Sequence, residues 1–156
     1  GTLLLGLMTA DFVLIVALAT PVLLLGLVLG ISVATGVVGM VVFILLAGLW
    51  GLAFTGFPYA IALRTGNPTA VNNAFLLFFP FAFLTTAYLP EEAMTGWLAT
   101  ATKFNPTTYL LDAMRALLQS GWEWSRIGEG VLAIAGMGAF SFTLAFRALR
   151  GRVNRS

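Results

Sequence analysis

The chain has 156 residues, of which 60% are hydrophobic and 9% are charged, and its formal net charge is +2. Ordinary soluble domains carry about 25% charged residues, so a soluble fold of this size could not bury so much apolar surface, and the small net charge does not indicate a nucleic-acid partner. The sequence contains neither cysteine nor histidine, which excludes a disulfide framework and a thiolate metal site and removes the commonest general base.

Two long apolar runs near the start of the chain predict membrane-spanning helices. The first covers residues 12–31, directly after Asp11, and about 20 apolar residues are enough to cross a bilayer. Asp11 is interpreted either as an interfacial residue at the start of this helix, where its charge suits the helix dipole, or as an ion or substrate contact. Pro21 lies in the middle of the run and is expected to kink it. The second span is predicted at residues 38–62.

Small residues recur in both runs. Gly26 and Gly30 are four residues apart, which is the spacing of a close contact between two helices. Gly48, Gly51 and Gly56 lie in the second run. They favour tight packing between spans, and a groove that faces the substrate is the alternative interpretation.

A polar segment separates the second run from the third. It contains Arg64, Asn67 and Pro68, and its succession of glycine, asparagine and proline predicts a turn. The third span is predicted at residues 71–89, where phenylalanines crowd around Pro80. Because of this proline, we expect the third span to be the most flexible one. Its aromatic rings are interpreted either as a surface for a flat hydrophobic substrate or as ordinary lipid-facing and core residues.

Residues 90–121 predict two short amphipathic helices that together form a hairpin. The first is expected to open at Pro90, because proline is favoured at the first helical position, and its apolar residues keep helical spacing as far as Phe104. Asn105 and Pro106 are expected to end this helix, because proline disfavours a helical conformation in the residue before it.

The second helix of the hairpin is expected to take its cap from Thr107 or Thr108 and to end at Gly121. Asp112 and Arg115 are three residues apart on its polar face and can pair. A helix of about 11 residues rises roughly 16 Å, whereas the hydrocarbon core is about 30 Å thick. We therefore expect a re-entrant or interfacial hairpin, which either dips into one membrane interface or lies on it.

A fourth span is predicted at residues 127–146, followed by a tail of residues 147–156 that carries four arginines. Since positive residues favour the cytoplasmic side, the tail and the loop at Arg64 are placed in the cytoplasm and the hairpin outside. Glu129, near the outer end of this span, is interpreted as an interfacial acid or as a partner of Arg126 or of the hairpin. The sequence therefore predicts an all-α integral membrane protein.

The hairpin residues resemble those of a known family. A segment with the pattern P-x-x-x-x-P/T-x-W-L runs from Pro90 to Leu98, and a segment with the pattern N-P-x-T-Y-x-x-D-x-x-R-x-L begins at Asn105. With an aromatic-rich span before them and one span after them, these segments resemble the C-terminal part of ABC-2 type transporter permeases, in particular the daunorubicin-resistance branch of drug exporters. The resemblance implies a six-span permease with four spans in this chain. Since the chain begins at Gly1 rather than Met, we expect an N-terminal part before it. No basic segment precedes the first apolar run, so the sequence does not predict a signal peptide.

The resemblance also implies a function, namely that of the transmembrane subunit of an ATP-driven ABC exporter. Such a subunit moves an amphiphilic drug, antibiotic or lipid-like molecule out of a bacterial cell. Two permease copies are expected to work with two copies of a separate cytoplasmic ATP-binding subunit, so that ATP is bound by the partner and this chain binds no cofactor itself. The hairpin is expected to form an outer gate with Pro90, Glu91, Trp97, Asn105, Pro106, Tyr109, Asp112 and Arg115. The expected contact with the ATP-binding subunit is the loop at Arg64, Asn67 and Pro68.

No motif in the sequence indicates catalysis by the chain itself. It has no Ser/His/Asp set, no metal-ligand cluster and no Gly-rich phosphate loop, since its glycines lie in apolar runs. An intramembrane enzyme would need paired acids or a histidine at membrane depth, and only Asp11 and Glu129 border the predicted spans. Two further functions stay open for such a chain, namely that of a permease for a lipid-linked polysaccharide and that of a membrane scaffold that transports nothing.

Overall fold

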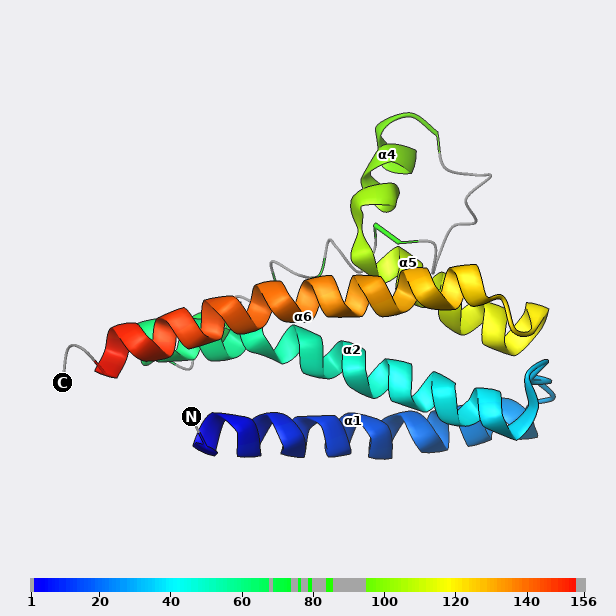
Figure 1. The fold of residues 1–156 in the computed structure, drawn as a ribbon, viewed down its shortest axis with the longest axis horizontal. Helices are drawn as coiled ribbons and strands as arrows, with labels where there is room; N and C mark the ends of the chain where they lie inside the picture. Colours follow the sequence, from blue (N-terminus) through cyan, green and yellow to red (C-terminus); the bar gives the residue numbers. More distant parts are fainter. Residues whose placement is uncertain are drawn as a thin grey trace.

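The computed structural model describes residues 2–67, 69–73, 76, 79, 84–85 and 95–153, and these residues form helices and turns with no strand. Three of the helices are long: α1 (Thr2–Val28), α2 (Gly36–Thr65) and α6 (Trp124–Val153). They run side by side, and α2 contacts both of the others (Figure 1). The N-terminal end of α1 and the C-terminal end of α6 lie at the same end of the molecule.

Within the described residues, three segments are long and apolar enough to cross a membrane. They are Gly6–Val28, Gly36–Thr65 and Trp124–Gly151. An all-helical protein with several candidate spans was predicted from the sequence, and the described helices agree with that class. The third span, expected at residues 71–89, and its expected flexible point at Pro80 fall largely or wholly outside the described residues. This span, and with it the total of four spans, stays a prediction.

Helix α1 corrects the expectation for the start of the first span. Asp11 lies well inside this helix rather than at its start, because the apolar residues before it contain nothing that breaks a helix and they continue it back to Thr2. Pro21 lies within the helix, as expected. The Gly26–Gly30 pair does not form one helical face, because α1 ends at Val28 and Gly30 adopts a positive φ of 93° in the turn that follows.

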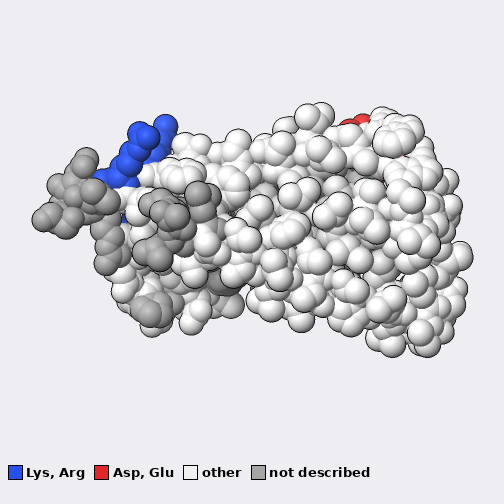
Figure 2. Space-filling model, turned by 60° about the horizontal axis from the view of Figure 1, so that its bottom comes forward, with Lys and Arg blue, Asp and Glu red and all other residues white. Residues whose placement is uncertain are grey.

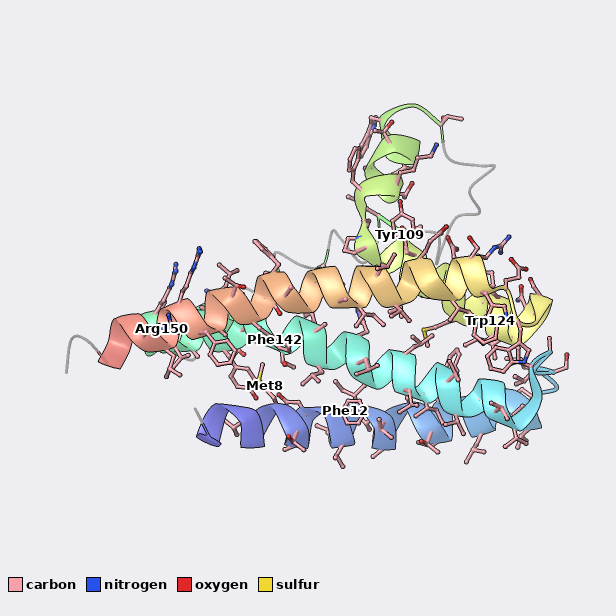
Figure 3. The ribbon with its side chains drawn as sticks, in the orientation of Figure 1. Met8, Phe12, Tyr109, Trp124, Phe142 and Arg150 are labelled. Carbon is pink, nitrogen blue, oxygen red and sulfur yellow. The ribbon has the colours of Figure 1, made fainter. Side chains whose placement is uncertain are left out.

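Glycines of α2 allow α1 to approach closely. A Cβ atom at Gly48 would lie 2.7 Å from the ring of Phe12 and 2.8 Å from Val16, and one at Gly51 would collide with Ile15. The side chains of α1 therefore fill the space that these two glycines leave open, and Phe12 extends from α1 toward α2 (Figure 3). This confirms the prediction of tight packing for these positions.

The contact between α2 and α6 also depends on glycine residues that leave room for the neighbouring helix. A Cβ atom at Gly56 would lie 2.6 to 2.8 Å from atoms of Ser141, including its backbone carbonyl carbon. Ser141 is fully buried, and its hydroxyl donates a hydrogen bond to the carbonyl of Ala53 on α2. A Cβ atom at Gly138 would lie 3.5 Å from the Cβ of Ala53, which is ordinary van der Waals contact. The two backbones are therefore close along this whole stretch.

Replacing Gly56 by alanine should destabilise the protein. The added methyl group meets backbone as well as side-chain atoms of Ser141, so neither can move aside cheaply. Overpacking of this kind costs about 1–3 kcal/mol, against a gain of about 1 kcal/mol in helix propensity. Thermal unfolding of the full-length protein in detergent measures the effect. The matched control is Gly136→Ala on α6, where nothing lies within 4 Å of the new methyl group. A Gly56→Ala variant as stable as the control would contradict the account.

Candidate functional site

Residues 95–121 are the described part of the predicted hairpin. Helix α4 covers Trp97–Phe104, α5 covers Pro106–Arg115, and a π-helical turn, η2, covers Ala116–Ser120. Helix α4 stands away from the three long helices, whereas α5 lies along α6 (Figure 1). The two arms of the hairpin therefore have different surroundings.

The first arm is shorter than the sequence predicted. Thr95 and Gly96 are not helical, and Gly96 has a positive φ of 65°, so a continuous helix from Pro90 to Phe104 is wrong. The helix begins at Trp97 instead, and this residue is 75% exposed. Pro90 and Glu91, two of the expected gate residues, lie outside the described residues.

Asn105 connects the two arms. Its backbone N–H donates to the carbonyl of Thr102 at 3.1 Å, and its Oδ1 accepts a hydrogen bond from the N–H of Thr107 at 3.0 Å. Its Nδ2 donates to the carbonyl of Leu84 at 2.7 Å, so the residue also holds a segment from before the hairpin. With only 4% of its surface exposed, Asn105 satisfies backbone groups on three sides.

The cap of α5 is therefore Asn105 and not Thr107 or Thr108. Asn105 follows the end of α4 and precedes Pro106 at the first helical position of α5, so one residue both ends one helix and caps the next. From the sequence, Asn105 is assigned only to the end of the first helix, and the predicted cap of the second helix therefore lies two or three residues too late. The hydroxyl of Thr108 is buried and makes no hydrogen bond within the described structure.

The other predicted hairpin residues lie on α5. The hydroxyl of Tyr109 donates to the carbonyl of Lys103 at 2.7 Å, which ties α5 back to the end of α4 (Figure 3). Asp112 and Arg115 form the predicted pair, at 3.1 Å. Both side chains are about one-third exposed or more, so this pair contributes only about 0.3–0.5 kcal/mol. It marks the polar face of α5 rather than holding the hairpin in place.

The opposite face of α5 belongs to the core of the molecule. A Cβ atom at Gly130 of α6 would lie 2.7 Å from the Cβ of Ala113 and 3.2 Å from the carbonyl oxygen of Tyr109. Ala113 is completely buried where the two helices cross. The core cluster combines residues of α2, α5, η2 and α6, namely Leu46, Ala53, Leu110, Ala113, Leu117, Ile127 and Ile134. The second arm of the hairpin is therefore packed into the bundle.

The end of the hairpin is fastened to the loop between α1 and α2. The N–H of Gly121 donates to the carbonyl of Ala116 at 2.8 Å, and Gly121 ends the helix at a positive φ of 102°, as predicted. The next carbonyls are taken by the loop: the hydroxyl of Thr35 donates to Leu117 at 2.7 Å, and the N–H of Ala34 donates to Leu118 at 2.9 Å. The last carbonyls of a helix need such partners, and nothing in the sequence pointed to this loop as their source.

A groove of about 360 Å³ lies between the hairpin and α6, lined by Phe104, Pro106, Tyr109, Glu129, Leu132 and Ala133. Glu129 accepts a hydrogen bond from Ser125 at 3.4 Å. Of the alternatives for Glu129, the pair with Arg126 is not formed, because Arg126 binds Glu123 at 2.7 Å.

One contact within the candidate spans was not foreseen. The hydroxyl of Tyr59 on α2 donates to Oδ2 of Asp11 on α1 at 2.5 Å. The interpretation of Asp11 as a cap at a helix start is therefore wrong, and its interpretation as an ion or substrate contact stays a prediction. Ionisable side chains inside spanning helices are rare and usually functional. Tyr59 could not be found from sequence, because 48 residues separate the partners.

The expected cytoplasmic loop begins where α2 ends. Arg64 lies in the last turn of α2 and is exposed, and Gly66 ends the helix with a positive φ of 62°. The side-chain oxygen of Asn67 accepts a hydrogen bond from the N–H of Thr69 at 2.9 Å. Pro68 lies outside the described residues. No group of three or more acidic, histidine or cysteine side chains that could hold a metal ion occurs in the part of the chain that the structure describes.

Comparisons with known proteins identify the family of this chain. A model of the family described as ABC-2 family transporter protein matches residues 2–147. The chain belongs to the ABC-2 transporter family. The resemblance that the hairpin residues carry is thereby confirmed.

One curated relative of this ABC-2 family chain is the daunorubicin resistance ABC transporter permease protein DrrB1 of Streptomyces coeruleorubidus. The two sequences are 27% identical over 139 residues, which cover 88% of this chain and 49% of the relative. The chain therefore spans about half the length of that permease. No solved structure matches the chain.

Replacing Asn105 by alanine should loosen the hairpin. The change removes the cap of α5, which is worth about 0.5–2 kcal/mol, and leaves the carbonyl of Leu84 without its donor, which costs about 1–3 kcal/mol. We expect a total loss of about 2–4 kcal/mol in the free energy of unfolding of the full-length protein. Asn67→Ala is the control, since Asn67 accepts a similar hydrogen bond in an exposed turn. Equal losses in the two variants would contradict the role given to Asn105.

Proposed function

We propose that this chain is part of the transmembrane permease subunit of an ATP-driven exporter. Two permease copies and two copies of a separate cytoplasmic ATP-binding subunit form the working complex, in the cell membrane of a bacterium. The match to the ABC-2 transporter family over residues 2–147 carries this proposal. Three candidate spans that pack through small residues support it, because a path across the membrane needs such a bundle.

The substrate is an amphiphilic drug, antibiotic or lipid-like molecule. The name of the curated relative, a daunorubicin resistance permease, supports this class. Aromatic rings also follow one another across α2 and onto α6, with centroid distances of 6.3 Å from Trp50 to Phe54, 5.6 Å from Phe54 to Phe57 and 5.7 Å from Phe57 to Phe140. Such a row of rings offers stacking contacts to a flat apolar molecule.

The orientation in the membrane follows from charge. Arginine side chains gather at one end of the molecule, where α6 finishes, and the long face that leads away from them is largely uncharged (Figure 2). Arg150 lies at this end and Trp124 at the opposite end of α6 (Figure 3). Since positive residues favour the cytoplasm, the Arg-rich end faces the ATP-binding subunit, with the loop at Asn67 as its contact, and the hairpin faces outward.

The hairpin acts as the outer gate, and it is coupled to the spans at three places. It contacts α6 at Gly130, the segment before the hairpin through Asn105, and the loop between α1 and α2 through Thr35. A shift of α2 against α6 therefore cannot leave the hairpin unchanged. Helix α2 carries Pro58 in its interior, which was not foreseen as a kink, and α1 carries Pro21. Prolines of this kind allow a spanning helix to bend.

Cross-linking α2 to α6 should stop export. The Cβ positions at Ala53 and Gly138 are 3.5 Å apart, within the range for a disulfide of about 3.5–4.5 Å, and the chain has no cysteine of its own. Inverted vesicles with the full-length permease and its ATP-binding subunit are expected to accumulate a fluorescent amphiphile when ATP is added. Oxidation of the Ala53→Cys/Gly138→Cys variant should reduce this uptake to background, and a membrane-permeant reductant should restore it.

The single-cysteine variants and a non-hydrolysable ATP analogue are the controls for the cross-link. Wild-type vesicles that take up no amphiphile in an ATP-dependent manner would count against the exporter itself. Uptake at the wild-type rate by fully cross-linked protein would count only against movement between α2 and α6.

A further inference from the structure

A pocket of about 560 Å³ opens where α2 and α6 end, at the Arg-rich end of the molecule. It is lined by Leu63, Arg64, Thr65, Gly66, Arg147, Ala148 and Gly151. Two candidate spans finish at this pocket, Gly36–Thr65 and Trp124–Gly151. In a membrane, the ends of spanning helices lie at the level of the lipid headgroups.

Two arginines line this pocket, and neither has an acidic partner among the described residues. Both ion pairs found among the described residues join neighbours near the hairpin, one at Asp112 and Arg115 and the other at Glu123 and Arg126. Arg64 and Arg147 form no ion pair within the described part of the chain, and both are exposed. Two cations that share one hollow repel each other, so an anion bound between them would stabilise the pair.

The shape and chemistry of the pocket suit a phosphate-bearing lipid. A guanidinium presents a planar fork of donors that matches phosphate oxygens in a bidentate manner. Apolar side chains, Leu63 and Ala148, lie beside the two arginines in the same lining. A site that is cationic on one side and apolar on the other fits a headgroup together with the start of its acyl chains. Basic pockets between spanning helices on the cytoplasmic side commonly hold anionic headgroups.

We propose that this pocket binds the phosphodiester headgroup of an anionic phospholipid, such as phosphatidylglycerol, with Arg64 and Arg147 as the two donors. This site is separate from the hairpin and from the row of aromatic rings. The proposed lipid site does not depend on the export function, because a lipid bound there would hold α2 and α6 together whether or not the protein transports a substrate. Bound lipid would also place a defined anion next to the loop at Asn67.

Native mass spectrometry of the full-length protein tests the site. The protein is incubated with phosphatidylglycerol or with zwitterionic phosphatidylcholine in detergent, and the lipid retained per protein is measured. Wild type should retain phosphatidylglycerol in preference. The Arg64→Gln/Arg147→Gln variant should lose this retention by at least about tenfold, since two charge-assisted contacts are removed. The single variant Arg147→Gln is measured as well, and its matched control is Arg150→Gln, which removes the same single charge from an exposed residue of α6 outside the pocket lining.

Three outcomes would overturn the proposal. An equal loss in the Arg150→Gln control would mean that net charge alone acts. Displacement of the lipid by millimolar inorganic phosphate would mean that the site takes a small free anion. Retention of the lipid by the double variant, with loss of the ATP-binding subunit, would mean that the two arginines contact protein.

A second variant keeps the test decisive if the glutamine variant does not fold. Arg64→Lys/Arg147→Lys retains both charges but not the forked donors, and it should lower the retention of phosphatidylglycerol by about threefold. Unchanged retention in this variant would contradict a site built on guanidinium geometry.

Discussion

Helix α6 can lie against α2 and α5 at the same time only because small residues stand at both crossings. Gly56 leaves room for Ser141, and Gly130 leaves room for Ala113. Lipid tails are as apolar as leucine side chains, so the hydrophobic effect contributes little to the association of spanning helices. Close packing and hydrogen bonds must drive their association instead. The buried hydroxyl of Ser141, which binds the carbonyl of Ala53, adds such a hydrogen bond at the point of closest approach. The hairpin could not join the core without this arrangement.

The hairpin is held by hydrogen bonds to backbone atoms far away in the sequence. Asn105 reaches the carbonyl of Leu84, and Thr35 reaches the carbonyl of Leu117, 82 residues away. Gly39 makes the second contact possible, because a Cβ atom there would collide with the side chain of Thr35. The end of the molecule that carries the hairpin is therefore one connected unit. If the hairpin is the outer gate proposed above, this connection makes it move as a whole with the long helices.

What could be predicted from the sequence was mainly local. The class of the protein, the pair of Asp112 and Arg115, and the end of the hairpin at Gly121 all follow from composition, from spacing on one helix turn, or from a single residue. The start of α1 was misjudged because a carboxylate was taken as a helix boundary, and it instead accepts a hydrogen bond from Tyr59 on another helix.

The missed residues share one property, which is that their partners lie far along the chain. Tyr59, Thr35 and Ser141 each bind a residue at least 48 positions away. A polar side chain in an apolar run looks the same in sequence whether or not it has such a partner. The motif that carried the family resemblance was more informative, since its Asn105 joins both arms of the hairpin. The reason for an asparagine at this position is seen only in the structure, where it forms hydrogen bonds with backbone groups of Thr102, Leu84 and Thr107.

The central claim is that this chain belongs to a permease whose energy comes from another subunit. Purification of the tagged, full-length protein in mild detergent, followed by identification of its partners and measurement of ATP hydrolysis, tests it most directly. The account predicts that an ABC-type ATP-binding subunit co-purifies and that its ATP hydrolysis depends on the permease. If no such subunit is recovered under conditions that keep known ABC complexes intact, the exporter loses its source of energy and the claim is contradicted.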